Sequence, residues 1–305
     1  LTDEKTNLEG LLSYLKNDPE FTMQLFLITR HLKDGMRRYT KKVDKYKYKT
    51  SKVEFEKEIK DFFINLFKNK LEYRLSDDDV SIEEYDIITD DLDNTIYTYT
   101  LNTNLDFADV IIDQINAGTN IPAVTSLENV EDNLWAYGVK VDFIHNSNNF
   151  IFFRKMNRGK IATAEENMLE RLKCNFSTNE SHLEVVKKDM INFDDKIDCF
   201  YMNDQFYIFK KNTFENMLGL EEEYKANAEE IIEDLEMNDV IDGMDIFQEK
   251  VKSSKRLLKK MANISRSGNH KNIDSQRIEN MKGITHRLDL ELEFTEDDKI
   301  KVENK

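Results

Sequence analysis

The sequence predicts an α+β protein built from two parts, and three observations lead to that class. Strand-like apolar patterns occur in both halves of the chain, segments with helical apolar spacing lie between them, and Gly118 and Pro122 mark a break. We therefore expect an N-terminal strand and helix domain over residues 1–120. A C-terminal domain of antiparallel β-hairpins flanked by helices is expected over residues 126–305.

In the first half, residues 21–28 are rich in apolar side chains and predict a buried strand. Ser51 followed by Glu54 has the spacing of a capping box and predicts the start of a helix. A strand over 95–101 and a short helix over 105–116 complete this half. The apolar face of the helix after Ser51 is expected to comprise Phe55, Ile59, Phe62, Phe63, Leu66 and Phe67.

The second half opens with apolar residues that alternate along 134–143, which predicts a strand that pairs with 150–156. Two more strand patterns are separated only by Asn203 and Asp204, which tolerate a positive φ, so a tight hairpin is expected there. Residues 160–195 predict a strand, a helix-like piece and another strand. The helix that follows is expected to bury Tyr224, Ala228, Ile231, Ile232 and Leu235.

Residues 244–264 predict one helix or a broken pair of helices. The polar segment 265–275 that follows is expected to be mobile. In the C-terminal tail, apolar residues alternate with acidic ones and predict a half-buried strand. The apolar positions of that strand are Leu288, Leu290, Leu292 and Phe294.

Composition limits the class of protein. The chain has 305 residues, 39% of them hydrophobic, so a sizeable core is expected. The formal net charge of -16 argues against a general binder of polyanions. The only cysteines, Cys174 and Cys199, form no CxxC pair, which fits free thiols in a reducing compartment. With no long apolar run and no signal-peptide pattern, we expect a cytoplasmic protein.

Charge is unevenly distributed along the chain. Residues 30–49 hold nine Lys or Arg and two Asp, and residues 250–271 hold eight Lys or Arg and no acid. Residues 77–93 hold nine acids and no base, and residues 221–249 hold twelve acids and one Lys. Two nearly pure basic blocks in so acidic a chain indicate confined binding surfaces for an anionic partner.

The second basic block is the stronger candidate for binding DNA. At about 100° per residue, its apolar residues fall on one side of a helix and its basic residues on the other. A row of cations on a rigid helix can release the counterions of duplex DNA. The alternative is a solvated face that balances the acidic helix before it. The candidate DNA-binding residues here are Lys252, Lys255, Arg256, Lys259, Lys260 and, beyond them, Arg266.

The first basic block interleaves cations with tyrosines over residues 37–49, a pattern that suits phosphate contacts with aromatic stacking. The alternative is an exposed edge strand that lysines keep from pairing with other chains. The candidate DNA-binding residues here are Arg37, Arg38, Lys41 and Lys42.

No stretch has a recognisable catalytic, cofactor or metal motif. The acidic loop 77–93 is expected to be solvated, although carboxylates of this kind can hold the metal ions of a nuclease. The five histidines are scattered and none has zinc-ligand spacing, so we expect no metal site. Cys199 lies within a strand and is expected to be a core residue. We therefore expect no catalytic residues and no cofactor.

The second half resembles the Kiwa protein KwaB-like family of bacterial anti-phage defence proteins. The resemblance rests on LWAYGVKVDF, FIFFRKM, INFDDKIDCFYMNDQFYIFKK, NTFENMLGLEEEYKANAEEIIEDL and KSSKRLLKKMANI, which together cover roughly residues 127–265. It implies a cytosolic DNA-binding component of a two-protein system whose other member is a small membrane protein, KwaA. Association with double-stranded DNA without sequence preference, homodimer formation and recruitment to the inner face of the cell membrane are likewise implied.

Charge and resemblance together predict a non-enzymatic effector that occupies phage DNA through electrostatic attachment. The net charge of -16 departs from the basic character of the family and implies a confined contact surface, or one built from two copies. Two alternatives remain open at this point. One is a metal-dependent nuclease whose carboxylates only the fold brings together, and the other is a scaffold that docks on an acidic or membrane partner.

Overall fold

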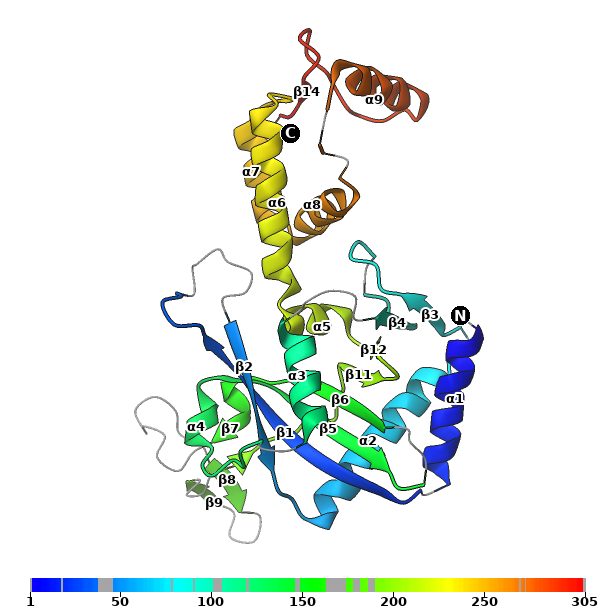
Figure 1. Cartoon of the computed structure of the whole chain (residues 1–305), viewed down its shortest axis with the longest axis vertical. Coiled ribbons are helices and arrows are strands. Elements are labelled where there is room, and N and C mark those ends of the chain that lie inside the picture. Colours follow the sequence, from blue (N-terminus) through cyan, green and yellow to red (C-terminus); the bar gives the residue numbers. More distant parts are fainter. Residues whose placement is uncertain are drawn as a thin grey trace. The chain divides into compact units, whose positions relative to one another are not determined.

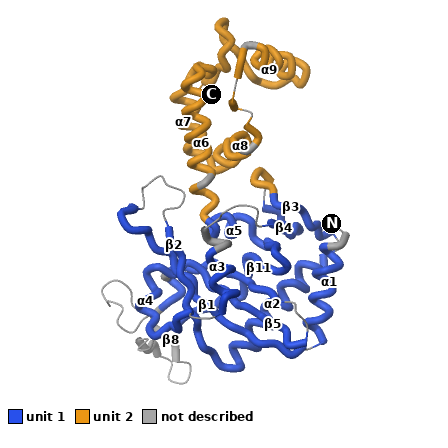
Figure 2. The backbone as a smooth tube through the Cα atoms, in the orientation of Figure 1, with its two compact units in different colours: residues 1–38, 44–85, 91–218 blue, residues 39–43, 86–90, 219–305 orange. Residues whose placement is uncertain are grey.

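The computed structural model describes residues 2–17, 19–37, 46–77, 79–89, 91–100, 106–118, 121–145, 149–162, 174–177, 182–185, 190–268, 270–271 and 273–303. The chain forms two compact units (Figure 2). Unit 1 comprises residues 1–38, 44–85 and 91–218, and unit 2 comprises residues 39–43, 86–90 and 219–305.

Unit 1 is organised around one sheet of eight strands in the order β2-β1-β5-β6-β11-β12-β4-β3 (Figure 1). All neighbours in it are antiparallel except β3 and β4, which run parallel. The strands are β1 (Phe21–Leu32), β2 (Tyr46–Val53), β3 (Ser81–Glu84), β4 (Thr95–Thr100), β5 (Leu134–Phe143), β6 (Asn149–Lys155), β11 (Cys199–Met202) and β12 (Gln205–Ile208).

Helices cover both faces of this sheet. Helices α1 (Thr2–Lys16) and α2 (Lys57–Leu75) bury leucine and phenylalanine side chains in one cluster with the facing strand residues. Helix α3 (Asp106–Ala117) packs on the other face, where Ile115 approaches the backbone at Gly138 beside Phe153. With both faces covered, the central strands are buried on both sides, so β5 has a continuous buried run rather than a simple alternation.

The α+β class is confirmed, but the chain divides elsewhere than at 118–126. Strands β1 to β4 from the first half pair with β5 and β12 from the second half in the same sheet. The boundary between the two units instead follows Leu218, where Gly219, with φ of +77°, precedes the next helix. Hydrogen bonds between strands remote in sequence decide the domain organisation, and the break at Gly118 and Pro122 is a loop within unit 1.

The predicted hairpin between β11 and β12 is confirmed. Asn203 and Asp204 have φ of 53° and 61°, as a two-residue turn of this kind requires. Around the sheet lie α4 (Glu128–Glu131), α5 (Lys211–Leu218), the 3-10 turn η1 (Arg158–Lys160) and the short strands β7 (Ile161–Ala162), β8 (Cys174–Ser177), β9 (His182–Val185) and β10 (Met190–Ile191). The helix-like piece expected within 160–195 would fall between β7 and β8, outside the described residues.

Unit 2 is mainly helical. It contains α6 (Leu220–Met237), β13 (Ile241–Asp242), α7 (Met244–Ser253), α8 (Lys255–Ser267), α9 (Ser275–Arg287) and β14 (Ile300–Lys301), with β13 and β14 paired in parallel. The expected core face of α6 is confirmed, because Tyr224, Ala228, Ile231, Ile232 and Leu235 are all buried. Helix α8 packs against α6 and α7.

Three local expectations are wrong. Ser51 lies in β2 rather than at a helix start, and α2 begins at Lys57 after Glu56, which makes no side-chain cap. Pairing of β2 with β1 over eight residue positions outweighs the local capping pattern. In α2 the buried face therefore shifts toward Leu71, and Phe62 is 43% exposed. The tail forms no strand over 288–294, where the leucines are exposed. Of the segment 265–275, residues 265–267 belong to α8 and Ser275 begins α9, and its mobility stays a prediction.

Candidate functional site

The stronger basic block lies on α7 and α8, which a break at Ser254 separates. Ser254 has an extended backbone, and its hydroxyl accepts a hydrogen bond from the Leu257 amide at 3.3 Å, so it caps α8. Of the two forms that the sequence allowed for residues 244–264, the broken pair is correct. The side chains of Lys252, Lys255, Arg256 and Lys260 are exposed, and that of Lys259 is half-buried.

The opposite side of the two helices faces the interior of unit 2, as predicted. Val251, Leu258 and Met261 are at most 5% exposed. Phe247 is half-buried, and Ile264, at 37% exposed, lies at the margin of the apolar face. Packing of the apolar face therefore turns the basic side chains outward, which positions them for a partner.

The cations at the start of α8 lie near acidic side chains of α6. The pKa of Glu221 on α6 is lowered by a hydrogen bond from Lys225 and, more weakly, by the charge of Lys255. Lys255 therefore balances part of the acidic surface of α6, as the alternative reading predicted. Arg256 and Lys260 are one helical turn apart and exposed, so they are the residues of this row best placed to reach a phosphate.

The structure does not describe the side chains of several predicted DNA-binding residues. Arg266 belongs to α8, but its side chain lies outside the described part of the chain. Arg38, Lys41 and Lys42 fall in the segment between β1 and β2 that the structure does not describe. Arg37 is described and is exposed just after β1.

Strand β2, which follows this segment, lies at one edge of the sheet. Lys47 and Lys49 are exposed on it, whereas Tyr48 and Thr50 are buried. The pKa of His31, on the neighbouring strand, is lowered by burial and then by the charges of Lys49 and Lys47. The edge-strand interpretation of this block is therefore confirmed for 46–51, whereas the outer side of Lys52 pairs with Pro122 and Val124. The lysines also make this part of the surface positive.

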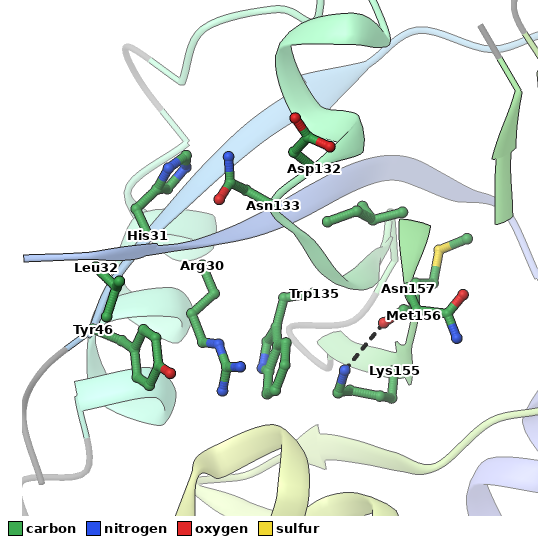
Figure 3. A pocket seen from close by; sticks show the side chains of 11 residues that line it. Arg30, His31, Leu32, Tyr46, Asp132, Asn133, Trp135, Lys155, Met156 and Asn157 are labelled. Atoms are coloured by element: carbon green, nitrogen blue, oxygen red, sulfur yellow. Dashed lines mark hydrogen bonds between the residues drawn. The ribbon is translucent and has the colours of Figure 1, made fainter. Parts of the chain in front are cut away.

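A pocket of about 570 Å³ opens beside this positive edge (Figure 3). Arg30 from β1, Trp135 from β5 and Lys155 from the end of β6 meet in it. The guanidinium carbon of Arg30 lies 3.1 Å from the centre of the Trp135 ring, and the Lys155 ammonium lies 3.4 Å from it. Figure 3 shows the indole between the two cations, with Tyr46 on the far side of Arg30. The remaining lining residues are His31, Leu32, Asp132, Asn133, Leu134, Met156 and Asn157.

The main chain fixes this arrangement. Antiparallel pairing places Lys155 opposite Ala136, next to Trp135 on β5. The Arg30 amide donates to the Asn133 carbonyl at 2.9 Å, so β1 holds Arg30 beside the start of β5. The Trp135 Nε1 donates to the main-chain carbonyl of Met217 at 2.9 Å, which fixes the plane of the indole.

The pKa of Lys155 is strongly lowered in the pocket. Burial and then the charge of Arg30 lower its pKa to about 8, while Asp198 opposes the shift. Its ammonium donates to the Met156 carbonyl at 3.1 Å. Two cations held around one indole favour an anion in the open part of the pocket, because an anion would offset their mutual repulsion.

An ion-pair network supports this part of β6. Arg154 donates to both oxygens of Asp194, at 2.8 and 2.9 Å, and to both oxygens of Asp198, at 2.9 and 3.1 Å. Burial opposes ionisation of Asp194, but hydrogen bonds from Arg154 and Lys160 outweigh it and lower its pKa to about 2. Burial raises the pKa of Asp198 despite the charge of Arg154. The network anchors the strand whose last residue is Lys155.

Sequence reasoning missed the pocket. It placed Trp135 on a strand face and FIFFRKM on the returning strand, but it did not connect either of them with Arg30, about a hundred residues earlier. The sequence feature that could have indicated the pocket is the single Trp of the chain, which lies at the start of a predicted strand whose expected partner strand carries Arg and Lys at its end. Only the pairing of β1 with β5 and of β5 with β6 brings the three residues together.

The acidic segment 77–93 has structural partners in the described residues. Both carboxylate oxygens of Asp91 accept hydrogen bonds from the first amides of α5, at 3.1 and 3.3 Å, which caps that helix. Asp93 pairs with Lys210 at 3.0 Å. The expectation of a solvated loop is therefore only partly correct. Cys199 is fully buried, and burial raises the pKa of its thiol, which confirms it as a core residue.

No helix among the described residues is both long enough and apolar enough to cross a lipid bilayer. Comparison with curated proteins and with solved structures found no match. The family model described as Kiwa protein KwaB-like matches residues 131–305, which is more than half of the chain and includes β5, β6 and α6 to α9. The chain therefore belongs to the Kiwa protein KwaB-like family and is a component of a Kiwa anti-phage defence system.

Proposed function

We propose that this chain is a non-enzymatic effector that binds double-stranded DNA without sequence preference and obstructs the machinery that works on phage DNA. The observation that carries the proposal is the row of exposed cations on α7 and α8, within a block of 22 residues that contains no acid. The contact surface is confined, because the chain as a whole has a net charge of -16. Phosphate contacts from such a row are independent of base sequence.

The spacing of the row suits a phosphate backbone. Arg256 and Lys260 are about 6 Å apart along the axis of α8. Two phosphate steps on one strand of duplex DNA advance about 6.8 Å along its axis. The α8 N-terminus, which Ser254 caps, adds partial positive charge next to Lys255 and Arg256. All of these contributions weaken as salt concentration rises.

A gel-shift titration on linear duplex DNA with magnesium tests the proposal. With four phosphate contacts per copy, affinity should fall about 150-fold between 50 and 200 mM salt. The exposed pair Arg256→Glu/Lys260→Glu should reduce that dependence to about 12-fold and weaken binding at low salt. A matched control with the same charge change is Lys57→Glu/Lys196→Glu, two exposed lysines of unit 1, which should bind as the unmodified chain does.

Three outcomes contradict the proposal. If the control variant loses binding as strongly as the α8 variant, the effect comes from total charge and not from the α8 row. If the unmodified chain does not shift DNA, the basic row serves a protein or membrane partner. If the DNA is shortened in magnesium and EDTA prevents it, the chain is a nuclease.

We also propose a homodimer and a membrane partner, KwaA, as the resemblance implies. Two copies would double the number of basic rows and help an acidic chain to retain DNA. Recruitment by KwaA would place the chain at the inner face of the cell membrane. Light scattering on the purified chain measures its mass, and co-purification with KwaA from membranes tests the partner. A monomer at micromolar concentration would contradict the dimer.

The pocket around Trp135 supports a second candidate function, the binding of a phosphate-bearing ligand in unit 1. Arg30 and Lys155 would hold the phosphate, and neighbouring strand ends would form the walls. Inorganic phosphate should raise the melting temperature of the unmodified chain more than an equal ionic strength of chloride does. The stabilisation should be absent in Lys155→Met. Equal effects of the two salts would exclude a phosphate site here.

A further inference from the structure

We propose that Glu230, Asp234 and His270 in unit 2 form a binding site for one divalent transition-metal ion, such as zinc. Among the residues that the structure describes, they are the only three His, Cys, Asp or Glu side chains whose ligand atoms converge, all within 4.8 Å of one another. Two carboxylates and one imidazole are a donor set that zinc and manganese accept.

The local structure explains why the three side chains meet. Glu230 and Asp234 are four residues apart on α6, so they project from the same side of the helix. Helix α8 ends at Ser267, and the capping residue Gly268, with φ of +66°, turns the chain. The Lys271 amide donates to the Gly268 carbonyl at 3.1 Å. Because α8 packs along α6, this turn delivers His270 to the side of α6 that carries the two carboxylates.

A second observation that points to a ligand is the burial of His270 without aligned hydrogen bonds to its ring nitrogens in the described part of the chain. Its side chain is only 1% exposed, and its Nε2 lies 3.2 Å from Oδ2 of Asp234. Neither ring nitrogen makes an aligned hydrogen bond among the described residues. Buried polar groups without a partner are uncommon and cost free energy. A metal ion at Nε2 would supply one of the two missing interactions and would offset the negative charge of Asp234 at the same time.

The distances leave room for an ion. Ligand atoms around a tetrahedral zinc ion lie about 3.3 Å from one another, given metal–ligand distances of about 2 Å. The separation between His270 and Asp234 already has that value, the ligand oxygen of Glu230 lies within 4.8 Å of both atoms, and the Glu230 side chain is exposed. That exposure also provides the entry path. Three protein ligands leave one position for water.

The surrounding charges favour a cation. Two carboxylates at an i, i+4 spacing repel each other, and an ion between them removes that repulsion. The ammonium of Lys271 lies 4.0 Å from Glu230 and partly compensates for its charge. Metal binding would displace Lys271 from Glu230. The imidazole disfavours calcium and magnesium, which prefer shells of oxygen ligands only.

The test is calorimetric titration of zinc chloride, and separately of manganese chloride, into the full chain. The chain is purified without a histidine tag and dialysed against a chelator that is then removed. We expect one ion per chain with a dissociation constant in the micromolar range or tighter, together with a higher melting temperature. Glu230→Gln and Asp234→Asn should each weaken binding on the order of 100-fold.

A matched control is Glu233→Gln, which removes an exposed carboxylate from the same helix outside the site and should leave the affinity unchanged. His270→Gln should abolish binding, and if that variant fails to fold, the exposed position Glu230 still decides the question. Binding that survives both carboxylate substitutions would place the ion elsewhere and overturn the proposal. Absence of zinc and manganese binding would overturn it as well, leaving His270 as a partner of Asp234 alone.

Discussion

The substitution Lys155→Met is expected to stabilise the protein at pH 7. In the folded state, burial and then the charge of Arg30 lower the pKa of Lys155 from 10.5 to about 8. The unfolded chain therefore holds the proton more tightly than the folded protein does, and the charged lysine destabilises the fold. Methionine keeps most of the aliphatic stem against Trp135 and removes the charge.

The magnitude follows from the shift in pKa. The change in pKa from 10.5 to about 8 corresponds to an upper limit of about 3 kcal/mol at pH 7. The side chain is half-buried, so solvent screening reduces this to about 2 kcal/mol. Loss of the cation–π contact with Trp135 costs about 0.5–1 kcal/mol. The expected net gain in the free energy of unfolding is about 1 kcal/mol.

Urea denaturation of both proteins between pH 7 and pH 10 measures this effect. Above pH 8 the folded protein loses the proton while the unfolded chain keeps it, so the unmodified protein gains stability from this group as pH rises toward 10.5. The unfavourable contribution of Lys155 should fall to about a quarter of its pH 7 value by pH 10. The exposed control Lys57→Met should change stability by less than about 0.5 kcal/mol at either pH. A variant less stable than the unmodified protein at pH 7, or a gain that is the same at pH 10, would refute the reasoning.

Three further predictions concern stability and are read by urea denaturation. Arg154→Met should cost about 3–5 kcal/mol, because it leaves the carboxylate of Asp198, which is 1% exposed, without its ion-pair partner; a cost below about 1 kcal/mol would contradict this. Gly243→Ala should cost about 2–3 kcal/mol, because φ is +88° and the added methyl would overlap the main-chain carbonyl of Val302. Gly283→Ala is the contrasting case and should stabilise the protein, because Gly283 lies within α9 with open space around it. Ser254→Ala should cost about 1 kcal/mol and lower the helical circular-dichroism signal, because α8 loses its N-terminal cap. An unchanged urea midpoint would show that the Ser254 hydroxyl does not stabilise α8.

Much of the candidate DNA-binding surface could be predicted from the sequence, because a helix places residues on its faces by their spacing alone. The basic row on α7 and α8 and the buried face opposite it are where the periodicity predicted them. The buried face of α6 could also be predicted from its spacing. The turn at Asn203 and Asp204 could be predicted because these two residue types tolerate a positive φ. Interactions with neighbours in sequence are sufficient in each of these cases.

Predictions failed where a distant partner decided the outcome. The capping pattern at Ser51 was overruled because β2 pairs with β1 through Val53. The alternating leucines from Leu288 to Leu292 have no strand to pair with among the described residues, so they lie exposed rather than in a sheet. Helical and strand periodicities state which side of an element is apolar, but they do not state whether a partner covers it.

The sequence by itself determined the α+β class, the family, the basic surface of α7 and α8, and the presence of helices at α2, α3 and α6 to α8, but it did not predict α1 or α9. The tertiary structure decided that both halves of the chain contribute to one sheet, that a pocket forms around Trp135, and that His270 reaches the carboxylates of α6. The physical reason is the range of the interactions. Faces, turns and caps depend on residues a few positions apart, whereas strand pairing and convergent sites depend on hydrogen bonds and packing between segments that are remote in the chain.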